Sequence, residues 1–154
     1  MIGPVTHSMF LDSEKATDAL GRLLAKHLAP GDTILLSGPI GAGKSHLCRA
    51  IIRARLGRME DVPSPTFTLI QTYEDPSGEI CHADLYRLSH PDEVLELGLE
   101  DAFATSICLV EWPDRLGPHV PETAICLVLA VENEGRRALI SFSGRPDLAE
   151  ALNA

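Results

Sequence analysis

The chain has 154 residues, of which 45% are hydrophobic, and its 22 acidic and 13 basic residues give a net charge of −9. This size and composition predict a single domain over residues 1–154, with a hydrophobic core, and they argue against a disordered chain. The acidic balance argues against a protein that binds nucleic acid on its own, because such binding depends on neutralising phosphates.

The chain opens with a strand and an amphipathic helix. We expect the first strand to end at residues 9–11 and Ser13 to cap the following helix, with Glu14 in its first turn. The helix carries one apolar stripe, formed by Ala16, Leu20, Leu23, Leu24 and Leu28. Pro30 and Gly31 then end the helix.

Residues 38–45 carry the pattern G-x-x-x-x-G-K-[ST] of a phosphate-binding loop. The run at residues 33–37 before it is typical of a buried parallel strand. Apolar residues recur at helical spacing over residues 47–54 after it. Strand, Gly-rich loop and helix therefore follow in the order that such a loop requires.

The residue types of this loop suit a phosphate chain. Gly41 and Gly43 have no Cβ atom that would obstruct a positive φ or a close approach of the ligand. Successive N–H groups at a helix N-terminus attract anions. We expect Lys44 to contact the β- and γ-phosphates and the Ser45 hydroxyl to bind Mg²⁺. The loop predicts a protein that binds a nucleoside polyphosphate.

A group of arginines surrounds the end of the helix after the loop: Arg49, Arg53, Arg55 and Arg58. Basic residues near a helix C-terminus commonly complement the helix dipole, which is the simpler interpretation. The alternative is a surface for an anionic partner.

A hairpin and a helix are expected next. Prolines at positions 63 and 65 favour an extended approach to Thr66. We predict strands at residues 66–73 and 82–88, joined by a turn at residues 74–78 and paired antiparallel. A helix over residues 91–99 and a further turn at residues 101–104 follow.

In residues 107–111, four apolar residues are followed by an acid, Glu111, which is the general form of a Walker B strand. A parallel strand delivers its last side chain to the carboxyl edge of the sheet, beside the phosphate loop. We therefore expect Glu111 to contact Mg²⁺ directly or through water, or to orient an attacking water. Trp112 follows, and it either packs under a helix or anchors a partner protein.

The chain ends with two strands, at residues 123–131 and 138–143, joined by a hairpin loop at residues 132–137. Pro146 opens a short helix with Leu148 and Leu152 facing inward. The whole pattern predicts an α/β fold of the three-layer P-loop NTPase type. Its central sheet is mostly parallel, is flanked by helices and has antiparallel strands added.

Leader and membrane-spanning segments are not recognisable in the sequence, so we expect a cytoplasmic protein with no membrane partner. The cysteines are scattered and form no C-x-x-C pair: Cys48, Cys81, Cys108 and Cys126. This spacing favours free thiols over disulfides or zinc ligands.

Several classes of nucleotide-binding protein fit a phosphate loop. A GTPase is disfavoured because neither Asn133 nor Asn153 begins an N-K-x-D element. A small-molecule kinase needs an Arg-bearing lid, and no long insertion after Glu111 supplies one. A compact ATPase that drives or gates a partner needs only the elements present. A nucleotide-dependent assembly module with little turnover is a further alternative.

Four segments in this order, GPIGAGKS, SPTFTL, HADLYRL and LVEWPDR, resemble the TsaE (YjeE) family of bacterial ATPases over residues 13–137. The resemblance implies a Mg²⁺-dependent ATPase that binds ATP and ADP and is weakly active alone. It also implies docking on a TsaB–TsaD complex during threonylcarbamoyladenosine synthesis in tRNA, with tRNA contacted only through the complex.

The resemblance further assigns site residues. Lys44, Glu111, Asp84 and Thr66 are the implied catalytic residues, with Thr66 in a switch-like segment. Ser45, Glu111 and Asp84 are the implied metal-site residues, although Asp84 has two simpler interpretations, a pair with Arg87 or a cap.

The implied nucleotide-binding residues are Ser13, Glu14, Gly38, Pro39, Ile40, Gly41, Ala42, Gly43, Lys44, Ser45, His46, Gly135 and Arg136. Pro39 and His46 depart from the family pattern, where an acid and a threonine are usual. Both lie outside the fixed positions of the loop, so nucleotide binding is expected to survive.

Overall fold

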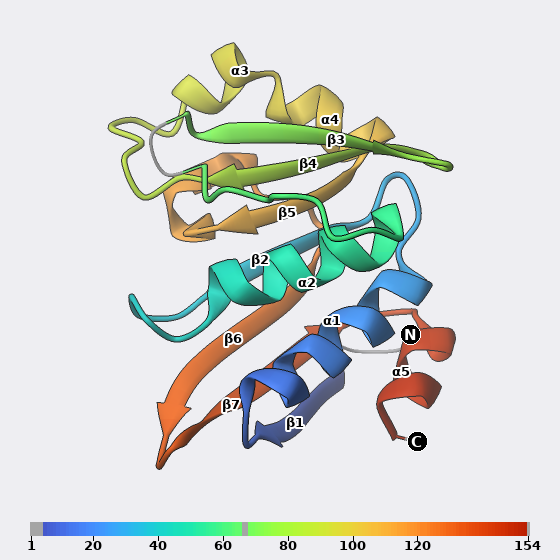
Figure 1. Ribbon diagram of the computed structural model, residues 1–154. Coiled ribbons are helices and arrows are strands. Elements are labelled where there is room, and N and C mark those ends of the chain that lie inside the picture. The colour runs from blue at the N-terminus through green and yellow to red at the C-terminus, as the bar shows by residue number, and fades with distance from the viewer. Residues whose placement is uncertain (1–4, 66–67, 154) are drawn as a thin grey trace.

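A computed structural model describes residues 5–65 and 68–153. Its strands form one seven-stranded sheet in the order β1-β7-β6-β2-β5-β4-β3 (Figure 1). The strands are β1 (Val5–Leu11), β2 (Thr33–Ser37), β3 (Ile70–Asp75), β4 (Gly78–Asp84), β5 (Ile107–Glu111), β6 (Ile125–Glu132) and β7 (Gly135–Phe142).

The centre of the sheet is parallel. Strand β2 pairs in parallel with both β5 and β6, and β4 pairs in parallel with β5. The antiparallel pairs are β3 with β4 at one side, and β6 with β7 and β7 with β1 at the other. The expected α/β fold, with a mostly parallel centre and antiparallel additions, is confirmed.

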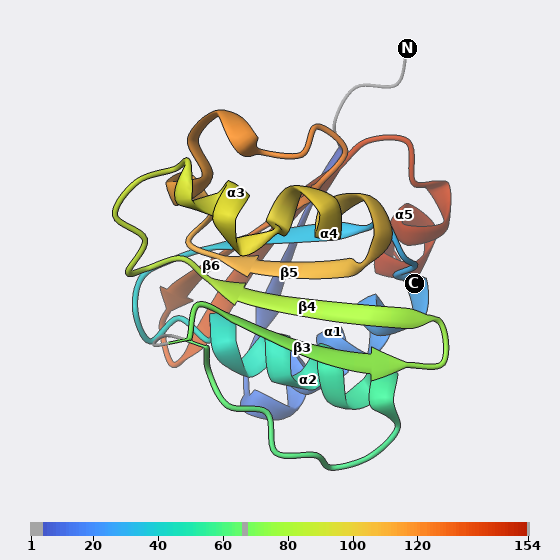
Figure 2. The same cartoon turned by 90° about the horizontal axis from the view of Figure 1, so that it is seen from above.

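Helices cover both faces of this sheet (Figures 1 and 2). The helices are α1 (Glu14–His27), α2 (Lys44–Leu56), α3 (Glu93–Leu97), α4 (Leu99–Thr105) and α5 (Pro146–Asn153), and a 3₁₀ segment, η1, spans Pro113–His119. Helices α1, α2 and α5 contribute to one apolar core, while α3, α4 and η1 contribute to a second. Within the described part of the chain, no helix is both long and apolar enough to cross a membrane.

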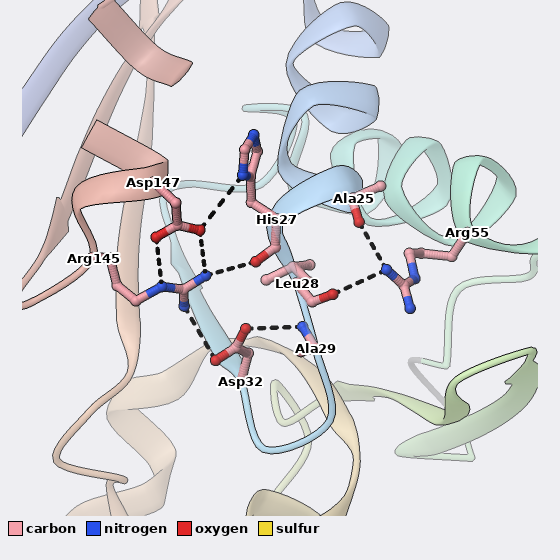
Figure 3. A network of polar contacts seen from close by, with 8 residues as sticks. All are labelled: Ala25, His27, Leu28, Ala29, Asp32, Arg55, Arg145 and Asp147. Carbon is pink, nitrogen blue, oxygen red and sulfur yellow. Dashed lines mark hydrogen bonds and ion pairs between the residues drawn. The ribbon is translucent and has the colours of Figure 1, made fainter. Parts of the chain in front are cut away.

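Helix α1 begins and ends as its sequence dictates. The Ser13 side chain accepts a hydrogen bond from the Ala16 amide at 3.2 Å, which confirms the predicted N-cap. At the other end, Arg145 donates to the His27 carbonyl and Arg55 donates to the Ala25 and Leu28 carbonyls (Figure 3). Two arginines distant in sequence therefore satisfy carbonyl groups that the helix end leaves unpaired.

The β3–β4 hairpin is antiparallel as predicted, but its strands are displaced from the expected ranges. Strand β3 starts at Ile70, after Leu69, which has a left-handed φ of 69° and whose amide bonds to the Pro65 carbonyl. The first two residues of the predicted strand, 66 and 67, lie outside the described residues. The predicted strand over residues 82–88 ends at Asp84, since the Asp84 side chain accepts from the Tyr86 amide and turns the chain.

The helix predicted over residues 91–99 is wrong in extent. Gly98 adopts φ 77° and divides this region into α3 and α4, with α4 continuing to Thr105. The Gly98 amide donates to the Val94 and Leu95 carbonyls, which ends α3, and the left-handed conformation turns the chain before α4 begins. The turn expected at residues 101–104 is part of α4.

The C-terminal strands are shifted toward each other relative to their predicted ranges, since β6 is Ile125–Glu132 and β7 is Gly135–Phe142. Strands β6 and β7 are joined by Asn133 and Glu134 alone, and Asn133 adopts φ 52°. A two-residue hairpin needs a left-handed residue, which asparagine tolerates, so the six-residue loop expected at residues 132–137 is wrong. Helix α5 is present, with Leu148 buried and Leu152 packed against the same core.

All four cysteines are free thiols, as expected. Three of them, Cys48, Cys81 and Cys108, are buried, whereas Cys126 is exposed on β6.

Candidate nucleotide-binding site

The phosphate loop connects β2 to α2, and α2 begins at Lys44 directly after Gly43. Gly43 and Gly41 have φ values of 101° and 85°, which residues with a side chain rarely adopt. A Cβ atom at Gly38 would lie 2.3 Å from the Leu129 carbonyl oxygen on β6, so this position accepts glycine alone. Glycines therefore give the loop its path into the N-terminus of α2.

Arg136 fastens the loop to the antiparallel part of the sheet. Its Nε donates to the Ala42 carbonyl at 3.1 Å and its Nη2 donates to the Gly41 carbonyl at 3.0 Å. These bonds tie two carbonyl groups of the loop to the first part of β7. The family resemblance assigned Arg136 to nucleotide binding, but its hydrogen bonds to the loop were not predicted.

Lys44 is buried and held by the loop itself. Its Nζ atom donates to the carbonyls of Gly38 and Pro39, and it lies 4.1 Å from the ring centroid of Trp112. Burial lowers the pKa of Lys44 below its ordinary value, and the charges of Glu111 and Asp84 act in the opposite direction. Phosphate oxygens at the loop would replace the carbonyls as its partners.

Ser45, Glu111 and His82 form one chain of hydrogen bonds. The Ser45 hydroxyl donates to Glu111 Oε1 at 2.9 Å, and His82 Nε2 lies 2.8 Å from Glu111 Oε2. A carboxylate oxygen accepts hydrogen bonds, so the histidine tautomer with its proton on Nε2 suits this contact. Both carboxylate oxygens are thereby held, and the Glu111 side chain is only 2% exposed.

Asp84 ends β4 beside Glu111, because the two residues are register partners in the parallel pair of β4 and β5. Its Oδ1 atom accepts from the Tyr86 amide at 3.0 Å. The capping interpretation of Asp84 is therefore correct for one oxygen. The residue also lines the cavity described below, so a capping bond and a place in the site coexist.

Trp112 follows Glu111 in a strained backbone conformation, with φ 59° and ψ 54°. Its ring lies 5.0 Å from the ring of Tyr86, at an interplanar angle of 48°. It is partly buried and packed against the core on the α3–α4 face, and it also contacts Lys44. The packing role proposed for Trp112 is thus present, at a position that borders the site.

A cavity of about 730 Å³ opens over the loop. It brings together most of the predicted site residues: Ser13, Glu14, Pro39, Ile40, Gly41, Gly43, Lys44, Ser45, His46, Asp84, Glu111, Trp112, Gly135 and Arg136. Gly38 and Ala42 belong to the loop backbone but do not line the cavity. Thr66 lies outside the described residues.

The oxygen groups of the site fit a magnesium ion. Two ligands on neighbouring corners of a Mg²⁺ octahedron lie roughly 2.9 Å apart, because each bond is about 2.0–2.1 Å long. The Ser45 hydroxyl and Glu111 Oε1 lie 2.9 Å apart, joined by a hydrogen bond that a metal ion would replace. A hydroxyl and a carboxylate are also the ligand types that Mg²⁺ prefers, so these two residues would hold it, with Asp84 nearby.

A second group of ligand atoms lies just behind. Cys48, His82 and Glu111 bring one atom each to within 4.8 Å of one another. Burial raises the pKa of the Cys48 thiol well above its ordinary value, so the thiol stays protonated and is a poor metal ligand. We therefore assign His82 to holding Glu111 in place through its hydrogen bond.

Some residues of the site were not identified from the sequence. His82 is the most important of them, because it is fully buried and contacts Glu111. Strand alternation places it on the same face as Asp84, two residues later, which is a signal that the sequence contained. Other unforeseen cavity residues are Leu11, Thr17, Arg49, Tyr86 and Glu134.

The sheet order, the loop between β2 and α2, and the acid at the end of β5 define a P-loop NTPase fold. The chain belongs to the family of the threonylcarbamoyl adenosine biosynthesis protein TsaE, whose sequence profile matches residues 11–139.

Two curated relatives illustrate the similarity, and both are named tRNA threonylcarbamoyladenosine biosynthesis protein TsaE. The protein from Rickettsia felis is 38% identical over 148 residues, which cover 95% of this chain and 86% of the relative. The protein from Bacillus subtilis is 34% identical over 124 residues, covering 80% and 77%. The crystal structure of YdiB from Bacillus subtilis superposes with a TM-score of 0.78 at 27% identity, covering 99% of this chain and 96% of that one.

Proposed function

We propose that this protein is an ATPase of threonylcarbamoyladenosine synthesis in tRNA, and that its turnover depends on partner proteins of the TsaB and TsaD type. The observation that carries the ATPase part is the meeting of Lys44, Ser45 and Glu111 at the phosphate loop. Membership of the TsaE family supports the pathway, because the relatives carry that name. The proposal places the protein in the cytoplasm, with tRNA contacted only through the complex.

Binding of ATP would use the loop amides at the N-terminus of α2 and the Lys44 ammonium. Lys44 would exchange the carbonyls of Gly38 and Pro39 for phosphate oxygens. Ser13, Glu14 and Gly135, which line the same cavity, would flank the base. Arg136 keeps the loop in shape through its bonds to Gly41 and Ala42.

Hydrolysis would take place beside Glu111. Mg²⁺ held by Ser45 and Glu111 neutralises charge on the phosphates when it is bound. Asp84 lies next to Glu111 and is placed to orient a water molecule or to bind the metal through one. Thr66, in the switch-like segment, completes the proposed γ-phosphate site. Since phosphoryl transfer is mostly positioning and charge neutralisation, an incomplete site would turn over slowly.

Dependence on a partner has a physical basis at Trp112. This ring covers Lys44, and the ring of Tyr86 packs against it at a tilted angle. A partner that moves Trp112 would free Lys44 from this contact and change how it meets the phosphates. Contacts at Trp112 would therefore alter ATP turnover without adding any group to the site.

The test is ATP hydrolysis by the purified protein, alone and with TsaB and TsaD proteins from the same source. We expect little phosphate release alone and a clear rise with both partners, abolished in Lys44→Ala. The rate must also rise with the Mg²⁺ concentration. Partner addition without effect would contradict the proposal, and ATP-dependent phosphorylation of a small metabolite would favour a kinase instead.

A further inference from the structure

A second cavity, of about 360 Å³, lies between α1 and α2. The two helices run side by side on one face of the sheet (Figure 1). They approach closely at Gly21, where an added Cβ atom would lie 2.6 Å from Cβ of Ala50. Arg22 directly follows Gly21, and Arg49 directly precedes Ala50. Both arginines line the cavity. We call this cavity the α1–α2 groove.

The groove is basic although the chain is acidic. Arg22, Arg49, Arg53 and Arg58 line it, against one lining carboxylate, Asp18. Asp18 is engaged by His46 at 2.8 Å, and Arg58 is paired with Glu60 at 2.7 Å. Arg22 and Arg49 have no hydrogen-bond or ion-pair partner in residues 5–65 and 68–153. Two guanidinium groups are therefore available to an anionic ligand.

The arginines near the end of α2 have different roles. Arg55 does not line the groove. It caps carbonyl groups at the end of α1 (Figure 3) and pairs with Asp75 at 2.6 Å. Helix capping thus explains Arg55. It does not explain Arg22 or Arg49, because Arg22 lies in the middle of α1 and Arg49 in the first half of α2.

The rest of the groove favours protein over RNA. Ala50, Ala54 and Gly57 line it together with Met59, whose side chain is 84% exposed. An exposed methionine beside arginines suits a peptide with one apolar side chain and acidic neighbours. RNA would gain little from Met59, and the net charge of −9 would oppose its approach.

We propose that the α1–α2 groove binds an acidic segment of the partner protein complex, with carboxylates on Arg22 and Arg49 and an apolar side chain on Met59. This inference rests on the proposed function for the existence of that complex. It adds the surface that the complex recognises and the chemistry of the recognised segment.

The position of the groove also connects docking with the nucleotide. Arg49 and His46 line both the groove and the nucleotide cavity. Both residues lie in α2, whose first two residues are Lys44 and Ser45. A partner carboxylate bound to Arg49 would therefore lie about one helical turn from the phosphate-binding residues Lys44 and Ser45. Docking in the groove is expected to tighten when ATP is bound, and nucleotide affinity is expected to rise equally with docking.

The experiment compares Arg22→Glu with Lys26→Glu. Both variants change one exposed basic residue of α1 to glutamate, but Lys26 does not line the groove. The Kd for the purified TsaB–TsaD complex is measured with ATP and Mg²⁺, together with ATP hydrolysis by each variant alone. We expect Arg22→Glu to weaken binding by about tenfold or more and Lys26→Glu by about twofold or less. Hydrolysis by the isolated variants should match that of the original chain.

A second variant, Met59→Ser, tests the apolar contact and should weaken binding without altering its dependence on salt. Equal effects of Arg22→Glu and Lys26→Glu, or no effect of Arg22→Glu, would overturn the groove as the docking surface. Loss of affinity for tRNA with unchanged affinity for TsaB–TsaD would instead make the groove an RNA surface. Failure of the original chain to bind TsaB–TsaD is the distinct result that removes the proposed function and this inference together.

Discussion

His82 Nε2 lies 2.8 Å from Glu111 Oε2, and this contact is entirely within the protein interior. The opposite oxygen of the same carboxylate accepts from Ser45. The other ring nitrogen of His82, Nδ1, is buried and has no hydrogen-bond partner among the described residues. The imidazole therefore has one evident task, which is to fix the orientation of Glu111.

Removing this contact should impair turnover more than nucleotide binding. His82→Leu leaves one Glu111 oxygen without its donor, and outer partners of metal ligands typically contribute about 10–100-fold to activity or metal affinity. We expect kcat to fall and the Mg²⁺ concentration for half-maximal activity to rise, with little change in the KM for ATP. His82→Gln should recover part of the loss, because its side-chain amide supplies a donor. Equal impairment in both variants would point to a packing role alone.

Glu111→Gln separates binding of the nucleotide from its hydrolysis. The substitution keeps the size of the side chain but removes the charge that a metal ion requires. We expect ATP to bind with Kd changed by less than about tenfold while Mg²⁺-dependent hydrolysis falls by about 100-fold or more. Calorimetric titration with ATP and a phosphate-release assay measure the two quantities. Retention of Mg²⁺-dependent turnover would remove Glu111 from the metal site.

Lys44→Ala should impair binding of ATP, the step before hydrolysis. Its ammonium group is the only cation that the loop sequence itself contributes, so its loss weakens contacts to the phosphates. We expect binding of ATP, and with it turnover, to be abolished or reduced by about 100-fold. Lys26→Ala, on the exposed part of α1, is the control for loss of one positive charge. An unchanged Kd in Lys44→Ala would exclude the loop as the phosphate site.

Stability should depend on Arg55 far more than on Arg58, three residues later. Arg55 pairs with the Asp75 carboxylate, which is 1% exposed, and caps the end of α1. Burial acts to raise the pKa of Asp75, but hydrogen bonds from Ser77 and Arg55 outweigh it and lower the pKa. Arg55→Ala leaves the Asp75 carboxylate with only its hydrogen bonds from Ser77 and Gly78, and it should cost about 3 kcal/mol in the free energy of unfolding.

The matched control is Arg58→Ala, which breaks an exposed pair with Glu60 and should cost less than about 1 kcal/mol. Urea unfolding followed by circular dichroism measures both values. Similar losses in the two variants would mean that the Asp75 pair contributes no more than a surface contact.

A pH-dependent contribution is expected where η1 meets α3 and α4. His119 contacts Asp92 at 3.0 Å and Glu100 at 2.9 Å, and hydrogen bonds to these two carboxylates raise the pKa of His119. A raised pKa in the folded state means that the stabilisation is complete below the unfolded value of about 6.5 and is lost as the pH rises through the folded value. The pKa of Asp92 is lowered, mainly by His119, so the pair also weakens when Asp92 is protonated in acid.

Comparison with His119→Gln tests this sign. The difference in unfolding free energy between the two proteins should be largest between about pH 4.5 and 6 and should shrink by about pH 8.5. A difference that grows toward alkaline pH would contradict the assignment. Nuclear magnetic resonance titration of the His119 ring gives the pKa directly.

Local patterns in the sequence were sufficient for the centre of the fold. The loop at residues 38–45 and the strand ending at Glu111 were both predictable, because fixed spacing and an unbroken apolar run specify them. Ser13 as a helix cap was also recognisable. These features depend on neighbouring residues only.

The features that were missed depend on distant contacts or on a single backbone angle. Gly98 interrupts a helical pattern through its left-handed φ, and Asn133 shortens a hairpin in the same way. The hydrogen bond from Arg136 to the Ala42 carbonyl joins residues 94 positions apart, and no periodicity encodes such a bond. Thr66 was proposed for the site, and its role stays a prediction.

Cys126 occupies the exposed side of β6, whereas the other three thiols are buried. A maleimide dye should therefore attach to a single place on the unmodified protein, without any engineered cysteine. That place is on the sheet, away from the groove between α1 and α2, so a dye there leaves the proposed docking surface free. Changes in its anisotropy would follow assembly with a partner in real time, while a loss of labelling would reveal any partner that covers the outer side of β6.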